Sequence, residues 1–314
     1  MTKKKTAGRI LQIIIVLFGI SFLTFCLIYL APGDPVKAMY AASGSVPSEE
    51  VLKTMRERMG LNDPFLTQYF NWLSGCMRGD FGNSYSLNKP VVTVLLQRIW
   101  PTLKLTLFSL TLMLAVSVPF GMLSAVKHNK AVDYIIRVLS FIGVSLPSFW
   151  LGVMLIYIFA LRFRLLPVIS TDTGFKKMIL PAVTLAFSMA AKYTRQVRAA
   201  VLEELHKDYV TGARTRGIKE SSILWAHVFP NALLPLVTLL GLSVGSLLGG
   251  TAVVEVIFSY PGLGSLAVSA VSARDYPLIQ GYVLWVALIY MVINLAIDIL
   301  YEILDPRTRG GVWL

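Results

Sequence analysis

Residues 10–31 have the sequence ILQIIIVLFGISFLTFCLIYLA and contain no charged side chain. A helix needs about 20 mostly apolar residues to cross the hydrocarbon core of a bilayer, where every backbone amide must be paired within the segment. Basic residues, including Lys3, Lys4, Lys5 and Arg9, precede the tract. A cleavable signal peptide also begins with basic residues, but its apolar part is usually shorter, so the pattern favours a retained membrane anchor.

The composition of the whole chain agrees with a membrane protein. Of its 314 residues, 55% are hydrophobic and 15% are charged, and the formal net charge is +12. This balance excludes a disordered chain or a basic nucleic-acid-binding arm. Cys26 and Cys76 have neither metal-binding nor disulfide-framework spacing, so we expect free thiols.

Further apolar tracts follow the first, and the sequence therefore predicts an all-α polytopic membrane protein with six transmembrane helices. The expected spans are 10–31, 103–126, 135–160, 178–191, 232–257 and 278–304. The fourth tract is the weakest, because its apolar part is short and Lys192 follows it.

The distribution of basic residues predicts the orientation. Connections rich in Lys and Arg stay in the cytoplasm. With six alternating spans, the basic N-terminus and the basic segment 192–230 fall on the cytoplasmic side, together with the C-terminus. The loop 162–177 carries four basic residues and is an exception, since it falls outside.

These spans divide the chain into four parts. They are an N-terminal tail with the first helix at 1–31, a small extracytoplasmic subdomain at 32–101, a five-helix core at 102–304 and a cytoplasmic tail at 305–314. Within the subdomain, turn clusters at 32–35 and 79–83 bracket an expected helix at 48–59.

The cytoplasmic segment 192–230 is too long for a simple turn between helices. Val197, Val201 and Leu205 recur at helical spacing, which predicts a helix with one apolar face. A short helix is expected at 208–216, and Gly217 suits the left-handed conformation that ends a helix. By composition alone, this basic helix either lies on lipid headgroups or docks on a cytoplasmic partner.

Residues 208–218 (DYVTGARTRGI) and 227–235 (HVFPNALLP) resemble the coupling-loop signature of bacterial ATP-binding-cassette importer permeases. In that family the signature is Glu-Ala-Ala, three residues, Gly, and then Ile-x-Leu-Pro. This chain keeps Gly217 and has Phe229 and Pro230 at the Leu-Pro spacing, but it has Thr211-Gly212-Ala213 in place of Glu-Ala-Ala.

Stretches along almost the whole chain are similar to the first permease subunit of the dipeptide, oligopeptide and nickel uptake group. They are residues 31–35 (APGDP), 60–64 (GLNDP), 79–84 (GDFGNS), 255–264 (EVIFSYPGLG), 274–277 (RDYP) and 304–307 (LDPR). The ensemble is far more specific than any one stretch.

The resemblance implies a type I importer permease fold in the bacterial plasma membrane and a non-catalytic subunit. It implies a second permease subunit, two cytoplasmic ATPase subunits that bind ATP and Mg, and an extracytoplasmic substrate-binding protein. This chain would bind no cofactor and no nucleic acid, and its surroundings would be membrane lipid. Di- or oligopeptides are the expected cargo, with nickel or a metal chelate as the alternative.

The same resemblance implies which residues couple to the ATPases. They are Tyr209, Thr211, Gly212, Ala213, Arg214, Thr215, Arg216, Gly217 and Ile218.

Small and hydroxyl side chains crowd the fifth span, which permits close helix packing or a wetted pore wall. The candidate translocation residues there are Ser243, Ser246, Thr251 and Glu255. An acid at membrane depth is a functional candidate by default. No metal site is predicted, because the three histidines are far apart in the sequence.

An ion-driven secondary transporter is the alternative from another class. Such a carrier is expected to show paired broken helices or a relay of buried carboxylates, and neither pattern is evident. A membrane-embedded enzyme would need a nucleophile, an acid pair or a metal cluster at depth, and the sequence offers none of these.

Overall fold

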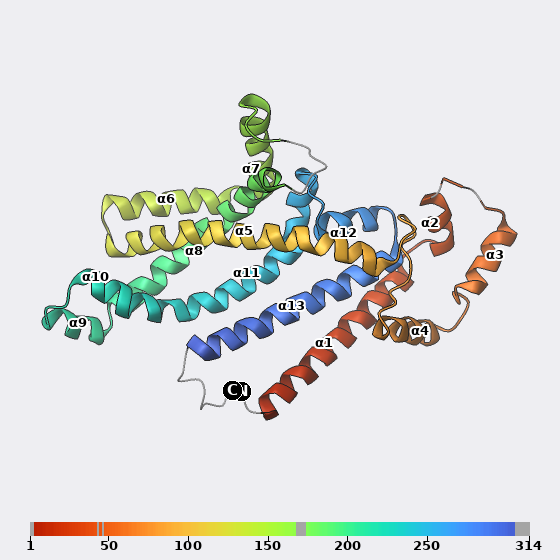
Figure 1. The fold of residues 1–314 in the computed structure, drawn as a ribbon, viewed down its shortest axis with the longest axis horizontal. Helices are drawn as coiled ribbons and strands as arrows, with labels where there is room; N and C mark the ends of the chain where they lie inside the picture. Colours follow the sequence, from red (N-terminus) through yellow and green to blue (C-terminus); the bar gives the residue numbers. More distant parts are fainter. Residues whose placement is uncertain (1–2, 43, 46, 168–173, 305–314) are drawn as a thin grey trace. The chain divides into compact units, whose positions relative to one another are not determined.

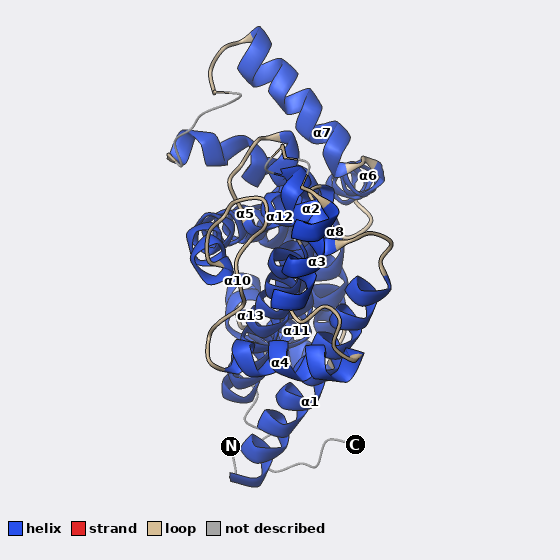
Figure 2. Cartoon of the chain, turned by 90° about the vertical axis from the view of Figure 1, so that its right-hand side faces the viewer, coloured by secondary structure: helices blue, strands red, loops and turns tan. Residues whose placement is uncertain are grey.

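The computed structural model describes residues 3–42, 44–45, 47–167 and 174–304 of the 314-residue chain. Helices make up almost all of these residues, and within the described ranges no strand is formed (Figure 2). A single isolated bridge joins Asn83 to Pro90. The predicted all-helical class is confirmed.

The chain forms two compact units, which are described separately. The first comprises residues 1–102 and 261–292, and the second comprises residues 103–260 and 293–314. Two long helices, α5 (Val91–Val126) and α13 (Tyr276–Leu304), contribute residues to both units (Figure 1).

The first unit begins with four helices. They are α1 (Lys3–Leu30), α2 (Pro35–Ala42), α3 (Glu49–Arg58) and α4 (Phe65–Met77). Helix α3 agrees with the helix expected at 48–59. Ser48 caps it, because the Ser48 hydroxyl accepts a hydrogen bond from the Val51 amide at 3.4 Å.

Aromatic side chains join α1 to α4. The ring of Tyr69 lies 5.3 Å from that of Phe22 and 5.5 Å from that of Phe25, in edge-to-face arrangements. The Tyr69 hydroxyl is within 2.8 Å of the Ser21 hydroxyl, so the polar tip of a fully buried tyrosine is satisfied. This packing holds α4 against the first membrane helix.

The rest of the first unit is built on α5 and α13. The short helix α12 (Leu263–Ser272) packs its Leu263 and Leu266 with Leu95 of α5 and Leu278 of α13 in one buried cluster. The Thr102 hydroxyl accepts a hydrogen bond from the Leu263 amide at 2.7 Å.

The second unit is a helical core. After α5 come α6 (Ala131–Ser145), α7 (Ser148–Leu155), the π-helix η1 (Ile156–Arg162), α8 (Phe175–Leu205), α9 (Asp208–Thr215), α10 (Glu220–Ser222), the π-helix η2 (Ile223–Val228) and α11 (Phe229–Ile257). Helix α8 contacts α6, α7 and α11, so it is the central element of this unit.

Glycines allow α8 to approach its neighbours closely. A Cβ atom on Gly121 of α5 would lie 2.6 Å from Val197 Cβ, and one on Gly143 of α6 would lie 2.6 Å from Ala191 Cβ. Both distances are too short for a side chain. Small residues at such crossings are typical of packed membrane helices.

In the described part of the chain, three helices are long and apolar enough to cross a membrane unaided, namely Leu11–Leu30, Val91–Val126 and Tyr276–Leu300. If each of two bent helix pairs forms one span, the number there rises to five. The expected span at 135–160 is not one straight helix, because α6 and α7 with η1 are long and apolar enough only together and meet at 97°. Pro147 lies at this break and forces the preceding Leu146 into an extended conformation, which ends α6.

The expected fourth span, 178–191, lies within α8. Charged residues flank its apolar part on both sides, with Lys176 and Lys177 before it and Lys192 and Arg195 after it. The long polar continuation of α8 ends at Leu205, next to the segment with the coupling-loop signature.

Candidate functional site

The segment with the coupling-loop signature forms helix α9 and its C-terminal turn. The helix runs from Asp208 to Thr215, within one residue of the range 208–216 predicted from the sequence. After the turn, the chain continues as one helical stretch through α10 and η2 into α11. All nine predicted coupling residues therefore lie on one short helix and the turn after it.

Gly217 ends α9 in a left-handed conformation with φ of +75°. Its amide donates to the Arg214 carbonyl at 3.0 Å, and the Ile218 amide donates to the Ala213 carbonyl at 3.2 Å. This pair of bonds is the Schellman motif, in which a glycine satisfies the last carbonyls of a helix. The predicted role of Gly217 in ending the helix is confirmed.

The inner face of α9 is anchored in the second unit. Val210 has no exposed surface and Ala213 is buried. Both belong to a cluster that includes Val201 of α8, Ile223 of η2 and Met122 of α5. With Ala232 and Leu236 of α11, four other helices contribute to this cluster and anchor α9.

A buried carboxylate also holds α9. Glu204, near the end of α8, is 8% exposed and accepts a hydrogen bond from the Tyr209 hydroxyl at 2.8 Å. The Lys207 ammonium group pairs with the same carboxylate. Glu204 thus connects the last turn of α8 to the first turn of α9.

The outer face of α9 is exposed. Among the predicted coupling residues, Thr211, Arg214, Thr215 and Arg216 are exposed. Arg214 Nε donates to Glu220 Oε1 at 2.7 Å, which closes the turn between α9 and α10. The hydrogen bond raises the pKa of Arg214 and lowers that of Glu220.

A buried ion pair behind this loop was missed by the sequence analysis. Arg198 of α8 donates two hydrogen bonds to Asp133 at the start of α6, and Ser124 of α5 donates a third at 2.6 Å. Asp133 has no exposed surface. The sequence contained no signal for this pair, because a helix pattern does not show which charges of separate helices meet.

The candidate translocation residues lie along α11, but their surroundings differ. The Ser243 hydroxyl is within 2.5 Å of the Tyr193 hydroxyl of α8. Thr251 and Glu255 lie one turn apart and have no exposed surface. The Thr251 hydroxyl has no hydrogen-bond partner within the described part of the chain. The side chain of Ser246 lies outside the described residues.

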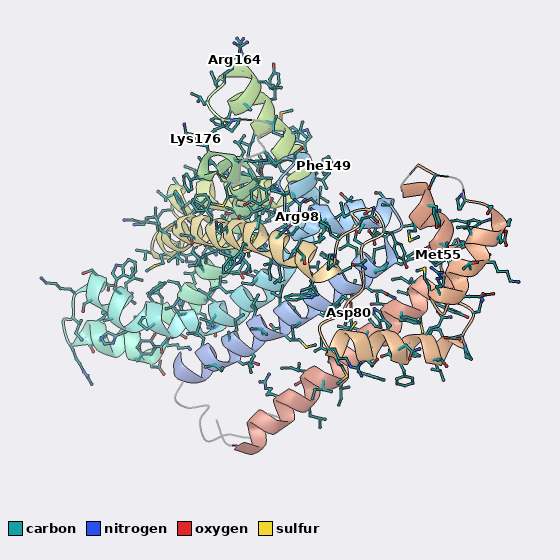
Figure 3. All side chains as sticks on the ribbon, turned by 45° about the vertical axis from the view of Figure 1, so that its right-hand side comes forward. Met55, Asp80, Arg98, Phe149, Arg164 and Lys176 are labelled. Atoms are coloured by element: carbon teal, nitrogen blue, oxygen red, sulfur yellow. The ribbon has the colours of Figure 1, made fainter. Side chains whose placement is uncertain are left out.

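The first unit contains a cavity of about 600 Å³. It is lined by residues of α1, α3 and α4 and by the start of α13, including Tyr29, Arg56, Trp72 and Gln280. Asp34 pairs with Arg56 at its wall, with Arg56 Nε 2.8 Å from Asp34 Oδ2. The side chains of Met55 and Asp80 in this unit are labelled in Figure 3.

Asp275 organises the first unit near this cavity. Its buried carboxylate accepts hydrogen bonds from the Ser84 hydroxyl at 2.6 Å and from the Ser86 amide at 2.9 Å. The loop that includes residues 84–86 is therefore fastened to the start of α13.

No cluster of three or more His, Cys, Asp or Glu side chains gathers within the described ranges.

Two family profiles cover most of the chain. The family described as "Binding-protein-dependent transport system inner membrane component" matches residues 117–310. Its N-terminal counterpart, "Binding-prot-dependent transport system membrane comp, N-term", matches residues 4–106.

Curated relatives match over nearly their full length. The oligopeptide transport system permease protein AppB of Bacillus subtilis (strain 168) is 40% identical over 309 residues, which is 95% of this chain and 97% of the relative. The glutathione transport system permease protein GsiC of Escherichia coli (strain K12) is 36% identical over 96% of this chain and 97% of its own. The probable peptide permease protein y4tP of Sinorhizobium fredii is 37% identical, with the same coverage.

A solved structure shares the fold. An inward-facing form of the MetNI methionine ABC transporter contains a chain that superposes with a TM-score of 0.58 at 19% sequence identity. The match covers 68% of this chain and 96% of that one.

Proposed function

Because this chain belongs to the family of binding-protein-dependent transport system inner membrane components, we propose that it is one of two permease subunits of an ATP-binding-cassette importer for short peptides. Two relatives are named for oligopeptide and glutathione transport, which supports a peptide or peptide-like cargo. The relative y4tP is named as the permease of a peptide ABC transporter, which supports an ATP-driven importer over the ion-driven carrier.

The observation that carries the coupling part of the proposal is the construction of α9. Its Val210 side is fixed in the core, and its Thr211 and Arg216 side is exposed. A helix held in this way fits a cleft of a cytoplasmic ATPase and transmits a rigid-body movement to the helices behind it. Tyr209 and residues 211–218 would then link the ATPase subunits, which bind and hydrolyse ATP with Mg, to the membrane helices.

In this proposal both termini and α9 lie in the cytoplasm, and the helices at 35–77 lie outside. The basic residues of the segment 192–230 support that orientation. The extracytoplasmic binding protein delivers the cargo to the outer side, and the second permease subunit completes the pathway.

The translocation path is proposed to follow α11. Ser243 and Ser246 supply hydroxyl groups, while Thr251 and Glu255 are enclosed in this conformation. The cargo would meet these two only after α11 moves relative to its neighbours, which is the kind of movement that coupling through α9 would produce.

The test is reconstitution of the complete complex in lipid with its ATPases and its binding protein. ATP hydrolysis and uptake are compared for dipeptides, longer peptides, reduced glutathione and nickel salts or chelates. Stimulation by peptides supports the proposal, whereas stimulation by nickel alone would replace peptides by the metal cargo. If the ATPases fail to associate with this chain, the coupling part is wrong.

A further inference from the structure

A surface of arginines and aromatic rings lies on α6 and α8. It consists of Tyr134, Arg137 and Phe141 of α6 and Arg195 of α8, and we call it the arginine–aromatic surface. The guanidinium carbon of Arg137 lies 4.5 Å from the ring centroid of Tyr134, and that of Arg195 lies 4.7 Å from the centroid of Phe141. Stacking of this kind holds the guanidinium flat and leaves its N–H edge available to an anion.

Among the described residues of the second unit, Arg195 has no ion-pair partner, and Arg137 shares Asp133 with Arg198. Asp133 pairs with Arg137, but its carboxylate already accepts both hydrogen bonds of Arg198. Arg137 Nε is 3.9 Å from that carboxylate and forms no hydrogen bond with the described residues, although it is buried. Lys192, one turn before Arg195 on α8, is exposed and adds another positive charge.

An apolar strip continues from the arginines along α6. Tyr134, Val138 and Phe141 share one side of the helix by their spacing, and Ile142 borders them. These four side chains are each at least 51% exposed in the chain. Arg137 stacks on Tyr134 near one end of the strip, and Arg195 stacks on Phe141 near the other. Cations beside an exposed apolar strip match the two parts of a phospholipid, its phosphate and its acyl chain.

We propose that the arginine–aromatic surface binds one anionic phospholipid, with the phosphate between Arg137 and Arg195 and an acyl chain along Phe141 and Ile142. A soluble anion would satisfy the arginines and leave the strip uncovered, whereas a lipid covers both. Excess positive charge favours an anionic headgroup over a zwitterionic one. The proposal rests on the membrane location of α6 and on neither the cargo nor the coupling function.

A lipid in this position would act on the same pair of helices that carries the Asp133–Arg198 ion pair. Its phosphate would pair with the Arg137 guanidinium from the solvent side, since that side chain is 35% exposed. The bound lipid would thereby fasten the start of α6 to α8, directly behind the segment proposed to meet the ATPases.

The experiment uses the complete complex in phosphatidylcholine nanodiscs that contain a minority of phosphatidylglycerol with a photoactivatable acyl chain. After illumination, mass spectrometry locates crosslinked peptides, and native mass spectrometry counts each lipid retained. The variants are Arg137→Gln with Arg195→Gln, the charge-preserving pair Arg137→Lys with Arg195→Lys, and the control pair Arg162→Gln with Arg164→Gln. Arg162 and Arg164 are exposed arginines at the end of η1, where Figure 3 labels Arg164.

We expect the unmodified complex to retain phosphatidylglycerol in preference to phosphatidylcholine and to crosslink within 131–145. The glutamine pair should retain at least about tenfold less phosphatidylglycerol, since each cation near the bilayer surface strengthens the attraction. The lysine pair and the control pair should retain most of it. If the complex with the glutamine pair does not assemble, the single Arg195→Gln variant replaces it. We expect that variant to show a smaller loss of phosphatidylglycerol.

Three results would overturn the proposal. They are equal retention of the two lipids, an equal loss in the control pair, and crosslinking of the surface to a neighbouring protein subunit. None of these measurements uses ATP hydrolysis or transport. A failure here is therefore distinguishable from a failure of the proposed importer function.

Discussion

Arg198 on α8 donates two hydrogen bonds to Asp133 at the start of α6, from Nε to Oδ1 at 2.7 Å and from Nη2 to Oδ2 at 2.8 Å. This arrangement is a two-point pairing between a guanidinium and a fully buried carboxylate. It joins the helix that leads to α9 with the turn between α5 and α6. A displacement of α9 would therefore reach α6 through this pair.

Removing one partner of this ion pair should destabilise the protein strongly. The substitution Arg198→Leu leaves the Asp133 charge buried, which typically costs about 3 to 5 kcal/mol. The double variant Asp133→Leu with Arg198→Leu should lose less stability, because no uncompensated charge remains. Thermal unfolding of the purified chain in detergent gives both values. A single variant as stable as the double variant would show that Asp133 is not held as a charge.

The close approach of α5 to α8 should make Gly121 intolerant of any side chain. A Cβ atom there would lie 2.9 Å from the Thr194 carbonyl oxygen and closer still to Val197, so Gly121→Ala should cost about 1 to 3 kcal/mol. The matched control is Gly212→Ala, a helical glycine with no atom within 4 Å of the new Cβ. The control should be neutral or stabilising by up to about 1 kcal/mol, because alanine favours a helix. Unfolding midpoints measured side by side test the contrast.

The ion pair of Asp34 with Arg56 should give the first unit a pH-dependent stability. Burial opposes ionisation of Asp34, but the hydrogen bonds from Arg56 and from the Val36 amide outweigh it and lower the pKa below 3.8. A lowered carboxyl pKa contributes stability above about pH 4, and this contribution disappears as the pH falls through the folded-state value.

Substitution of Asp34 by Asn tests this dependence. The loss of stability relative to the unmodified chain should be constant between pH 6 and pH 8 and should shrink below about pH 4. The measurement is thermal unfolding of both proteins from below pH 4 up to pH 8. A difference that grows with acidity would mean that the carboxyl group is protonated in the folded chain at neutral pH.

Local signals predicted several elements well. The helix expected at 48–59 agrees with α3, and Gly217, which indicated the end of α9, forms the cap there. The apolar tracts located α1, α11 and α13, because long runs of apolar residues have few alternatives in a membrane. These features depend on residues close together in the chain.

Features that depend on tertiary contact were not predicted. The bend at Pro147 was hidden in an apolar run that reads as one span, although the proline itself was visible. Arg198 was interpreted only as a cytoplasmic charge, because its partner is 65 residues away. Burial of Thr251 and Glu255 follows from packing around α11, which polarity along one helix does not reveal.

The left-handed turn at Gly217 offers the sharpest test of the coupling proposal. No atom lies within 4 Å of a Cβ placed on Gly217, so a substitution there acts through the backbone conformation and blocks nothing inside the chain. Residues other than glycine pay about 1 to 2 kcal/mol in the left-handed region, and β-branched residues are the least compatible with it, whereas asparagine adopts it readily. We expect Gly217→Val to reorient the end of α9 and to reduce ATPase association and peptide uptake together.

The substitution Gly217→Asn is the matched control and should retain most of both activities. Co-purification of the ATPases and uptake into proteoliposomes provide the two readouts. If Gly217→Val left assembly and transport intact, α9 would not be the element that couples ATP hydrolysis to the membrane helices. If Gly217→Val abolished ATPase association while thermal unfolding stayed close to that of the asparagine variant, the loss would be assigned to the docking geometry of α9 and not to the stability of the fold.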